Sequence, residues 1–368
     1  MSKRASKAIS ERIGLDFSTL PQNEEDMKAC KRLGSTLAIC TALLASASAT
    51  HAQEVMNDPF RDPALSALKG KTIAYLPISI GFDLAQAWGG VVKQQAEVYG
   101  MKFTSQDPNW NTGAMVQGFT ALLASKPDVI LTQNPDMQSL ARLMKQANQQ
   151  GIVVVQMNMA GAVQTDAVVA PDFIGMGEAI ARKVVEKCGA TTQTSHKVSI
   201  VQGVLTGGVS FYQVQGIKKV FAQHPEIKVV SSQAADWDAS KARAITETAL
   251  QQHPDMCAVI DVWDGQGVGT GAAIKQAKLS DKVFYITSGG GAQSMCDKLK
   301  DGTFSAVYNY DAVGMGRDAW TAIMVALQNK KGGGAIKTQM YSPYRYMTKE
   351  DVKDGTCFTP EYYAKILR

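Results

Sequence analysis

Short apolar runs alternate with segments of helical periodicity along most of this chain. The apolar run at residues 71–76 predicts a strand, and apolar positions from Leu84 to Gly100 recur every three or four residues, which predicts a helix. The same alternation continues downstream. It predicts further strands at 102–105, 128–132 and 152–156 and helices at 114–124 and 137–149.

A second series of the same kind follows. It predicts strands at 197–201, 228–232, 258–262, 283–287 and 305–308, with helices at 211–223, 239–252, 267–277 and 292–300. Strands that alternate with helices are typical of parallel sheets covered by helices on both faces. Two such series predict an α/β protein with two lobes. Trp88 and Trp320 fall at helical spacing with other apolar residues and are expected in the core.

The N-terminal part reads as a secretory signal. A basic segment at 27–32 is followed by an apolar run at 33–44 and a small-residue stretch at 45–52. The apolar run is too short to span a bilayer, which needs about 20 residues. We expect residues 1–52 to be removed, with cleavage after Ala52 or Ala49 and a true start at Met27, and residues 53–69 to form an extension.

The charge balance argues against a polyanionic partner. Without residues 1–52 the chain has 31 Lys and Arg against 28 Asp and Glu, spread evenly and without a basic run or an aromatic and basic stripe. Nucleic acid is therefore not expected as a partner.

Four cysteines lie beyond the signal segment: Cys188, Cys257, Cys296 and Cys357. In an oxidising compartment they allow three full pairings, and the sequence does not choose among them. Cys257 lies in an apolar strand, where a buried free thiol is the commoner state, and a bridge between Cys296 and Cys357 is favoured. The spacings match no zinc motif. His224 and His253 each precede a proline at a corner, which indicates a turn, so neither a metal nor a cofactor is expected.

Function is expected in the loops that follow the strands, because open α/β sheets bind ligands beyond the carboxyl ends of their strands. Aromatic, amide and acidic residues gather in these loops. Aromatic faces pack on C–H surfaces while amides and carboxylates bond hydroxyl groups, so the loops predict a cleft for a small hydroxyl-rich ligand. The expected ligand-binding residues there are Phe82, Asp83, Trp110, Asn134, Asn158, Met159, Trp237, Trp263, Asp264, Gly289 and Asn309. The glycines at 289–291, ahead of a helix, also raise the hypothesis of an anion cradle.

Five segments carry a resemblance to a known family. They are GIVVVQMN at 151–158, KVSIVQG at 197–203, AADWD at 234–238, HPDMCAV at 253–259 and DGQGVGTGA at 264–272. Their order and spacing resemble those of ribose-type periplasmic binding proteins, the substrate-capturing subunits of sugar ABC importers. The resemblance covers about residues 71–347.

The resemblance implies two Rossmann-like lobes joined by three hinge crossings, which close over a sugar and then dock on a membrane permease. The first lobe would comprise residues 70–171 and 310–337, and the second 172–309 and 338–368. It also implies a monomer in the periplasm, and presentation to a chemoreceptor is compatible with this role.

Several site positions depart from the family pattern. An Asp-Arg pair is replaced by Asn158-Met159, an arginine by Phe211, an Asn-Asp pair by Trp263-Asp264 and a carboxylate by Gly289, whereas the aromatic Trp237 and the amide Asn309 are kept. These changes remove charge-assisted hydrogen bonds. The site, Phe211 included, is therefore expected to be aromatic and weakly charged. A sugar or polyol is the favoured ligand, and a less polar cyclic or aromatic compound is the alternative.

Enzymatic function is not expected. The chain has no Gly-x-Ser-x-Gly elbow, no His-Glu-x-x-His motif and no histidine beside a candidate nucleophile. A secreted glycosidase, with Asp83 and Asp264 as its carboxylates, is the rival hypothesis. A repressor of the same architecture would need a DNA-binding segment where the signal lies.

Overall fold

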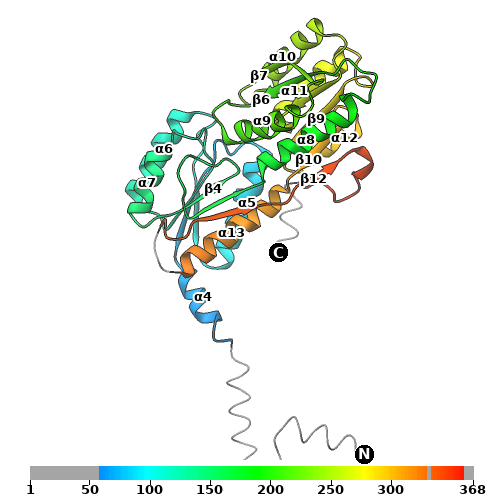
Figure 1. The fold of residues 1–368 in the computed structure, drawn as a ribbon. Helices are drawn as coiled ribbons and strands as arrows, with labels where there is room; N and C mark the ends of the chain where they lie inside the picture. Colours follow the sequence, from blue (N-terminus) through cyan, green and yellow to red (C-terminus); the bar gives the residue numbers. More distant parts are fainter. Residues whose placement is uncertain (1–57, 330–332, 360–368) are drawn as a thin grey trace, which may run out of the picture. The chain divides into compact units, whose positions relative to one another are not determined.

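The computed structural model describes residues 58–329 and 333–359 (Figure 1). The described residues from 63 onward belong to one compact unit. The predicted signal segment, with Met27 and the cleavage positions, lies outside the described residues. Helix α4 (Arg61–Leu68) lies in the predicted extension, and its last residue is buried. Within the described ranges, no helix is both long and apolar enough to cross a membrane.

The first lobe is built on a six-stranded sheet. Its strands are β1 (Thr72–Leu76), β2 (Lys102–Ser105), β3 (Val129–Thr132), β4 (Val153–Met157), β5 (Ala167–Ala170) and β11 (Thr338–Tyr341). They are all parallel and lie in the order β11-β5-β4-β3-β1-β2. Helix α13 (Ala312–Gln328) packs on α5 (Asp83–Val98), and α6 (Thr112–Ser125) packs on α7 (Ala141–Gln149). Strands β3 and β4 are buried along their whole length, as expected for a sheet between helices.

The second lobe repeats this plan. Its strands are β6 (Lys197–Gln202), β7 (Lys228–Ala234), β8 (Ala258–Asp261), β9 (Phe284–Gly289), β10 (Ala306–Asn309) and β12 (Arg345–Met347). The order is β12-β10-β9-β8-β6-β7, with only β12 antiparallel to its neighbour. Helix α8 (Phe173–Cys188) packs on α9 (Gly208–Phe221), and α10 (Ala239–Gln252) packs on α11 (Asp264–Gln276). Helix α12 (Gln293–Lys300) and the short helix η1 (Lys349–Asp351) complete it. The prediction of two α/β lobes with mainly parallel sheets is confirmed.

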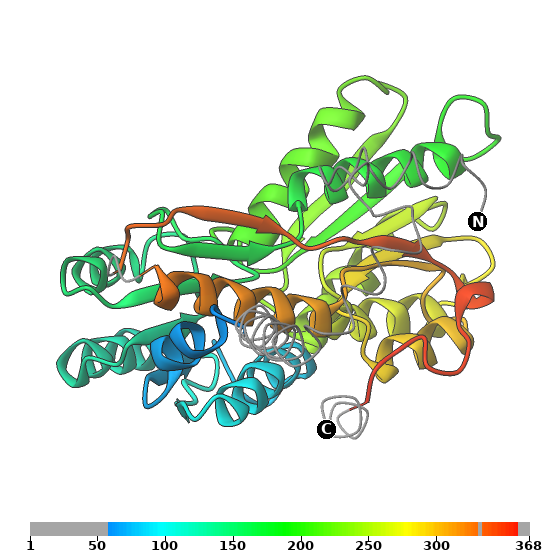
Figure 2. The same cartoon turned by 90° about the horizontal axis from the view of Figure 1, so that it is seen from below.

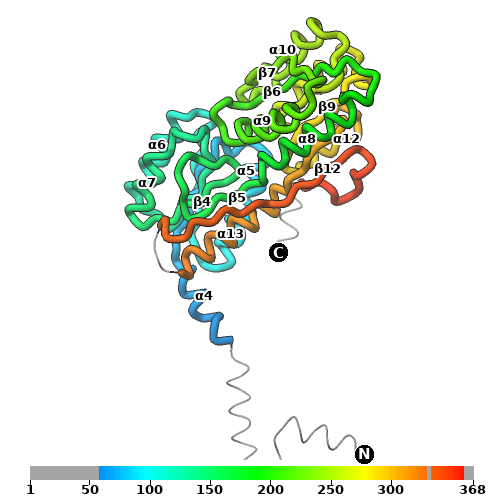
Figure 3. The backbone as a smooth tube through the Cα atoms, in the orientation of Figure 1, coloured from blue at the N-terminus to red at the C-terminus, as the bar shows by residue number. Residues whose placement is uncertain are grey.

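The chain passes between the two sheets three times: after β5, after β10 and after β11 (Figures 2 and 3). The third passage corrects the predicted boundary at residue 337. Strand β11 pairs with β5 in the first sheet, so the chain leaves the first lobe only after Tyr341. It then enters the second sheet at β12. Both strands are short, and β11 is mostly exposed, so they leave little periodic signal in the sequence.

Both pairs of cysteines form disulfides, and both bridges lie in the second lobe. Cys296 on α12 is joined to Cys357, as predicted, with Cα atoms 6.2 Å apart. Cys188, the last residue of α8, is joined to Cys257 with Cα atoms 6.0 Å apart. The expectation of a free thiol at Cys257 is wrong, because the end of α8 comes back to the start of β8. Helix α8 was not among the predicted helices.

Candidate functional site

A small, partly open cavity of about 20 Å³, called the aromatic cavity below, lies where the strand-end loops of the two lobes meet. Its walls come from the loops that follow strands of both sheets and from the first turns of the helices beyond them. It is lined by Ile78, Phe82, Leu84, Trp110, Gln133, Asn158, Met159, Val209, Trp237, Trp263 and Tyr310. None of these side chains carries a charge. The lining of this cavity is therefore largely aromatic and uncharged.

Four aromatic rings from the two lobes form a continuous cluster around this cavity. The ring centroids of Phe82 and Trp110, both from the first lobe, lie 5.1 Å apart. The ring of Trp263, from the second lobe, lies 5.8 Å from that of Phe82 and 6.0 Å from that of Trp110. Trp237 lies 6.0 Å from Trp263. These are the separations of favourable aromatic pairs, so this aromatic cluster joins the lobes.

Glycines make room for the two tryptophans of the second lobe. A Cβ atom added to Gly203, at the end of β6, would clash with the ring of Trp237. One added to Gly265, on α11, would clash with the ring of Trp263. The backbone therefore approaches each ring more closely than any residue with a side chain would permit.

Three lining residues have left-handed backbone conformations. Trp110 has φ 64°, Asn158 has φ 59° and Trp237 has φ 67°. Residues other than glycine adopt this region at a cost of about 1 kcal/mol or more, and strained residues of this kind gather at binding and catalytic sites. The conformations turn three strand-end side chains toward one cavity.

Amide groups supply the polar part of the cavity wall. The buried Asn158 side chain has no hydrogen-bond partner for its Oδ1 atom within the part of the chain that the structure describes. Asn134 lies behind the wall. Its Nδ2 donates to Gln156 Oε1 and to the Met159 carbonyl, both at 2.7 Å. Asn134 therefore supports the loop that carries Asn158, and only Asn158 of the two lines the cavity.

A second cavity of about 220 Å³ adjoins the first. The two share three lining residues, Phe82, Leu84 and Trp263. Asp83, the first residue of α5, and Asp264, the first residue of α11, line this acidic pocket from opposite lobes. Asp83 Oδ2 accepts a hydrogen bond of 3.0 Å from Ser294 Oγ on α12. One hydrogen bond thus links the lobes across the pocket.

Burial raises the pKa of two carboxyl groups, Asp264 in the acidic pocket and Asp261 close to it. Burial, followed by the negative charge of Asp83, raises the pKa of Asp264 to about 8. Burial raises the pKa of Asp261, at the end of β8, to about 7, although Gln266 Nε2 and Thr270 Oγ1 donate hydrogen bonds to it at 2.7 and 2.8 Å. At neutral pH the Asp264 carboxyl is therefore mainly protonated, and can both donate and accept hydrogen bonds.

Gly289 does not contact the cavity but gives Asp264 its place. A Cβ atom at Gly289 would clash with the Asp264 carboxyl group. The Asp264 carboxyl group therefore occupies the space that a side chain at Gly289 would fill.

Besides Asn134 and Gly289, two more predicted site residues, Phe211 and Asn309, lie outside both cavities. Helix α9 begins at Gly208, one turn earlier than predicted, so Phe211 lies within the helix, where it is 48% exposed and packs edge-on against Tyr212. Asn309 lies in a separate pocket beside the second passage between the lobes, where its Oδ1 accepts a hydrogen bond from the Asp311 backbone.

Five lining residues were not predicted: Ile78, Leu84, Gln133, Val209 and Tyr310. Gln133 and Tyr310 directly follow β3 and β10, so the rule of strand-end loops could have found them. The three apolar residues are indistinguishable in sequence from core residues. Trp88 and Trp320 are buried in the core as predicted.

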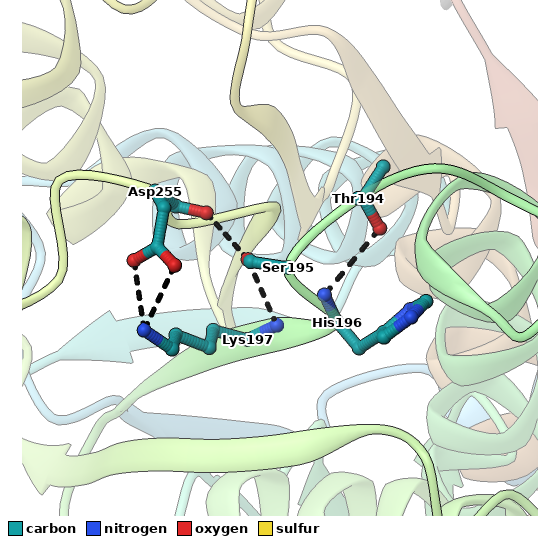
Figure 4. Close-up of polar contacts among 5 residues, drawn as sticks. All are labelled: Thr194, Ser195, His196, Lys197 and Asp255. Atoms are coloured by element: carbon teal, nitrogen blue, oxygen red, sulfur yellow. Dashed lines mark hydrogen bonds and ion pairs between the residues drawn. The ribbon is translucent and has the colours of Figure 1, made fainter.

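Ser195 and His196 are adjacent in the chain but do not form a nucleophile and base pair (Figure 4). Ser195 Oγ donates to the Asp255 carbonyl, and Lys197 Nζ pairs with the Asp255 carboxylate at 2.8 Å. The His196 ring nitrogen Nδ1 contacts the Cys188 carbonyl at 2.6 Å. These contacts close the loop before β6, at the opposite end of the strand from the cavities. Among the described residues, no group of three or more His, Cys, Asp or Glu side chains is placed to hold a metal ion.

The sequence of this chain is similar to those of periplasmic binding proteins. The model of the periplasmic binding protein domain matches residues 73–331. The ribose import binding protein of Bacillus subtilis is 26% identical over 65% of this chain and 76% of its own length. The D-ribose/D-allose-binding protein of Pseudomonas aeruginosa is 24% identical over 73% of this chain and 79% of its own.

Solved structures show the same fold. An ABC transporter solute-binding protein from Agrobacterium vitis, bound with alpha-D-tagatopyranose, superimposes with a TM-score of 0.69 at 22% identity, over 78% of this chain and 97% of that one. A solute-binding protein from Burkholderia graminis, in complex with D-arabinose, has a TM-score of 0.69 at 21% identity, over 78% and 99%.

Proposed function

The chain belongs to the periplasmic binding protein family, and we propose that it is the solute-binding component of a sugar ABC importer. It captures a sugar or a similar neutral polyol between its lobes and delivers the ligand to a membrane permease. Relatives named for ribose and allose and structures with bound tagatose and arabinose support this class of ligand. None of them supports the less polar compound or the glycosidase considered from the sequence.

The aromatic cluster is the observation that carries the proposal. Phe82 and Trp263, from opposite lobes, line both the aromatic cavity and the adjoining pocket of about 220 Å³, where their rings can cover the C–H faces of a sugar ring. Asn158 Oδ1, in the aromatic cavity, can accept a hydroxyl hydrogen bond. Because rings of both lobes would contact the same molecule, ligand binding would stabilise the closed arrangement of the lobes.

The polar groups indicate a neutral ligand. The aromatic cavity has no charged lining residue. In the acidic pocket, Lys298 is paired with Asp301 at 3.6 Å, and the raised pKa of Asp264 keeps that carboxyl mainly protonated at neutral pH. Hydroxyl groups, which both donate and accept, match this pocket, whereas a carboxylate or phosphate would meet Asp83 without a free cation among the lining residues.

The family implies the periplasm as the location. We propose that residues 1–52 are the export signal, that the mature protein is a monomer without catalytic activity or cofactor, and that Asp83, Asp264 and the residues around the aromatic cavity form its binding site. Presentation of the loaded protein to a chemoreceptor is compatible with this role.

A thermal-shift screen of the mature protein with neutral sugars, polyols, aromatic alcohols and charged sugar derivatives tests the proposal. A ligand at 100 times its dissociation constant adds about 2.7 kcal/mol of stability, so a specific neutral sugar should raise the melting temperature clearly. Stabilisation by charged compounds alone would refute a neutral site. Chemical conversion of a bound sugar would refute a pure binding role.

A further inference from the structure

Gly290 lies in the loop after β9 and contacts the opposite lobe. A Cβ atom added there would clash with Leu84 Cδ2 and lie 3.0 Å from the Ala312 Cβ atom. Leu84 is the second residue of α5, in the first lobe, and is 4% exposed. A first-lobe side chain therefore lies directly against second-lobe backbone, at a distance that only glycine permits.

The loop that carries Gly290 is fixed in place by the rest of the second lobe and by the start of α13. The Gly290 carbonyl accepts a hydrogen bond of 2.9 Å from the Ala312 backbone, and the Gly291 carbonyl accepts one of 2.9 Å from Phe358. Phe358 also receives a 2.8 Å bond from the Gln293 backbone and follows the cysteine that is bridged to α12. The loop therefore has little room to retreat when a side chain is added, so the buried Leu84 side chain or the start of α5 that carries it must shift.

The contact between Leu84 and Gly290 lies beside both cavities and beside one of the passages between the lobes. Leu84 lines both cavities, and Gly290 lines the acidic pocket. Ala312 begins α13 directly after the chain has passed from the second sheet to the first. A separation forced beside this passage turns one lobe against the other about the hinge, and so pulls apart the rings of the aromatic cluster that come from different lobes.

We propose that the contact between Leu84 and Gly290 sets how far the two lobes close, which makes Gly290 a positioning residue for ligand capture. The inference rests on the proposed function for its biological meaning. It assigns the glycine triplet a role in closure, where the sequence alone raised an anion cradle.

Acrylamide quenching of tryptophan fluorescence tests the inference without a ligand, because Trp110 and Trp263 approach each other from opposite lobes. In Gly290→Ala we expect quenching to rise about twofold, since a shifted equilibrium toward open lobes exposes these rings. The matched control is Gly90→Ala on α5, where an added Cβ meets no atom within 4 Å. It should quench like the wild type.

The double variant Gly290→Ala with Leu84→Ala removes the clashing carbon and should return quenching to the level of Leu84→Ala alone, the signature of direct coupling. Wild-type quenching in Gly290→Ala, or no recovery in the double variant, would overturn the inference. If Gly290→Ala does not fold, Leu84→Phe makes the same clash from the other lobe and must raise quenching. If the variants show this quenching pattern but the protein binds no sugar, the closure contact stands and the proposed function is refuted.

Discussion

Replacing Asp264 with asparagine should remove a pH-dependent loss of stability. The carboxyl pKa is raised to about 8 by burial and by the charge of Asp83, and asparagine keeps the shape while removing the titration. The titratable and charged groups around it come from several elements: Asp83 from α5, Asp261 from β8, Tyr285 from β9, Tyr310 after β10 and Lys298 from α12.

The sign follows from proton linkage. The folded protein holds the Asp264 proton more tightly than the unfolded chain, so the free energy of unfolding falls as pH rises from 3.8 to about 8. Each pH unit in this window costs at most about 1.4 kcal/mol, and the whole window at most about 6 kcal/mol. Because the side chain is partly exposed, solvent lowers these limits, and we expect about 2 kcal/mol between pH 5 and pH 8.

Urea unfolding at several pH values from 5 to 9 measures this contribution as a difference between the variant and the wild type. Asp264→Asn should become steadily more stable relative to the wild type as pH rises to 8, with no further gain above it. Asp261 titrates with the same sign and is present in both proteins, so only the part of its titration that depends on Asp264 enters the difference. The exposed Asp281→Asn is the control and should follow the wild type. Parallel stability curves for Asp264→Asn and the wild type would refute the reasoning.

Three further outcomes can be checked. Trp263→Ala and Trp237→Ala should each weaken sugar binding by about 2 kcal/mol, or about thirtyfold, in calorimetric titration while the protein stays folded; full affinity in both would remove the aromatic cluster from the site. Asn158→Gly should lower affinity about tenfold by removing the amide, yet not lower the melting temperature, because glycine accepts the left-handed backbone; unchanged affinity would contradict its role. Replacing Cys188 and Cys257 with serine should cost the second lobe about 2–5 kcal/mol in urea unfolding under oxidising conditions, and an unchanged midpoint would count against the bridge.

The sequence predicted the site best where local pattern decides it. Phe82, Trp110, Trp237 and Trp263 follow strands of parallel sheets, and strand ends on one side of a sheet must meet, so the strand positions alone brought these rings together. Tertiary packing determines the left-handed conformations of Trp110 and Trp237 and the need for glycines next to the tryptophan rings. Such packing leaves no periodic pattern in the sequence.

The failures have a common origin in tertiary structure. Phe211 was misplaced because α9 begins one turn early, and a shift of one turn changes a residue's neighbours. Leu84 lines the site yet has the pattern of a core residue. The partner of Cys257 depends on where α8 ends, 69 residues away along the chain. Each of these outcomes depends on which residues meet in three dimensions, and residue spacing along the chain does not contain that information.

Both disulfides lie in the second lobe, and the described residues of the first lobe contain no cysteine. A reducing agent thus weakens one half of the molecule and leaves the covalent structure of the other unchanged. A sugar held by rings from both lobes would link these unequal halves thermodynamically, since its binding energy is lost when either half unfolds. The loaded protein should therefore unfold as one cooperative unit, and reduction should separate the unfolding of the two halves most clearly when no sugar is bound.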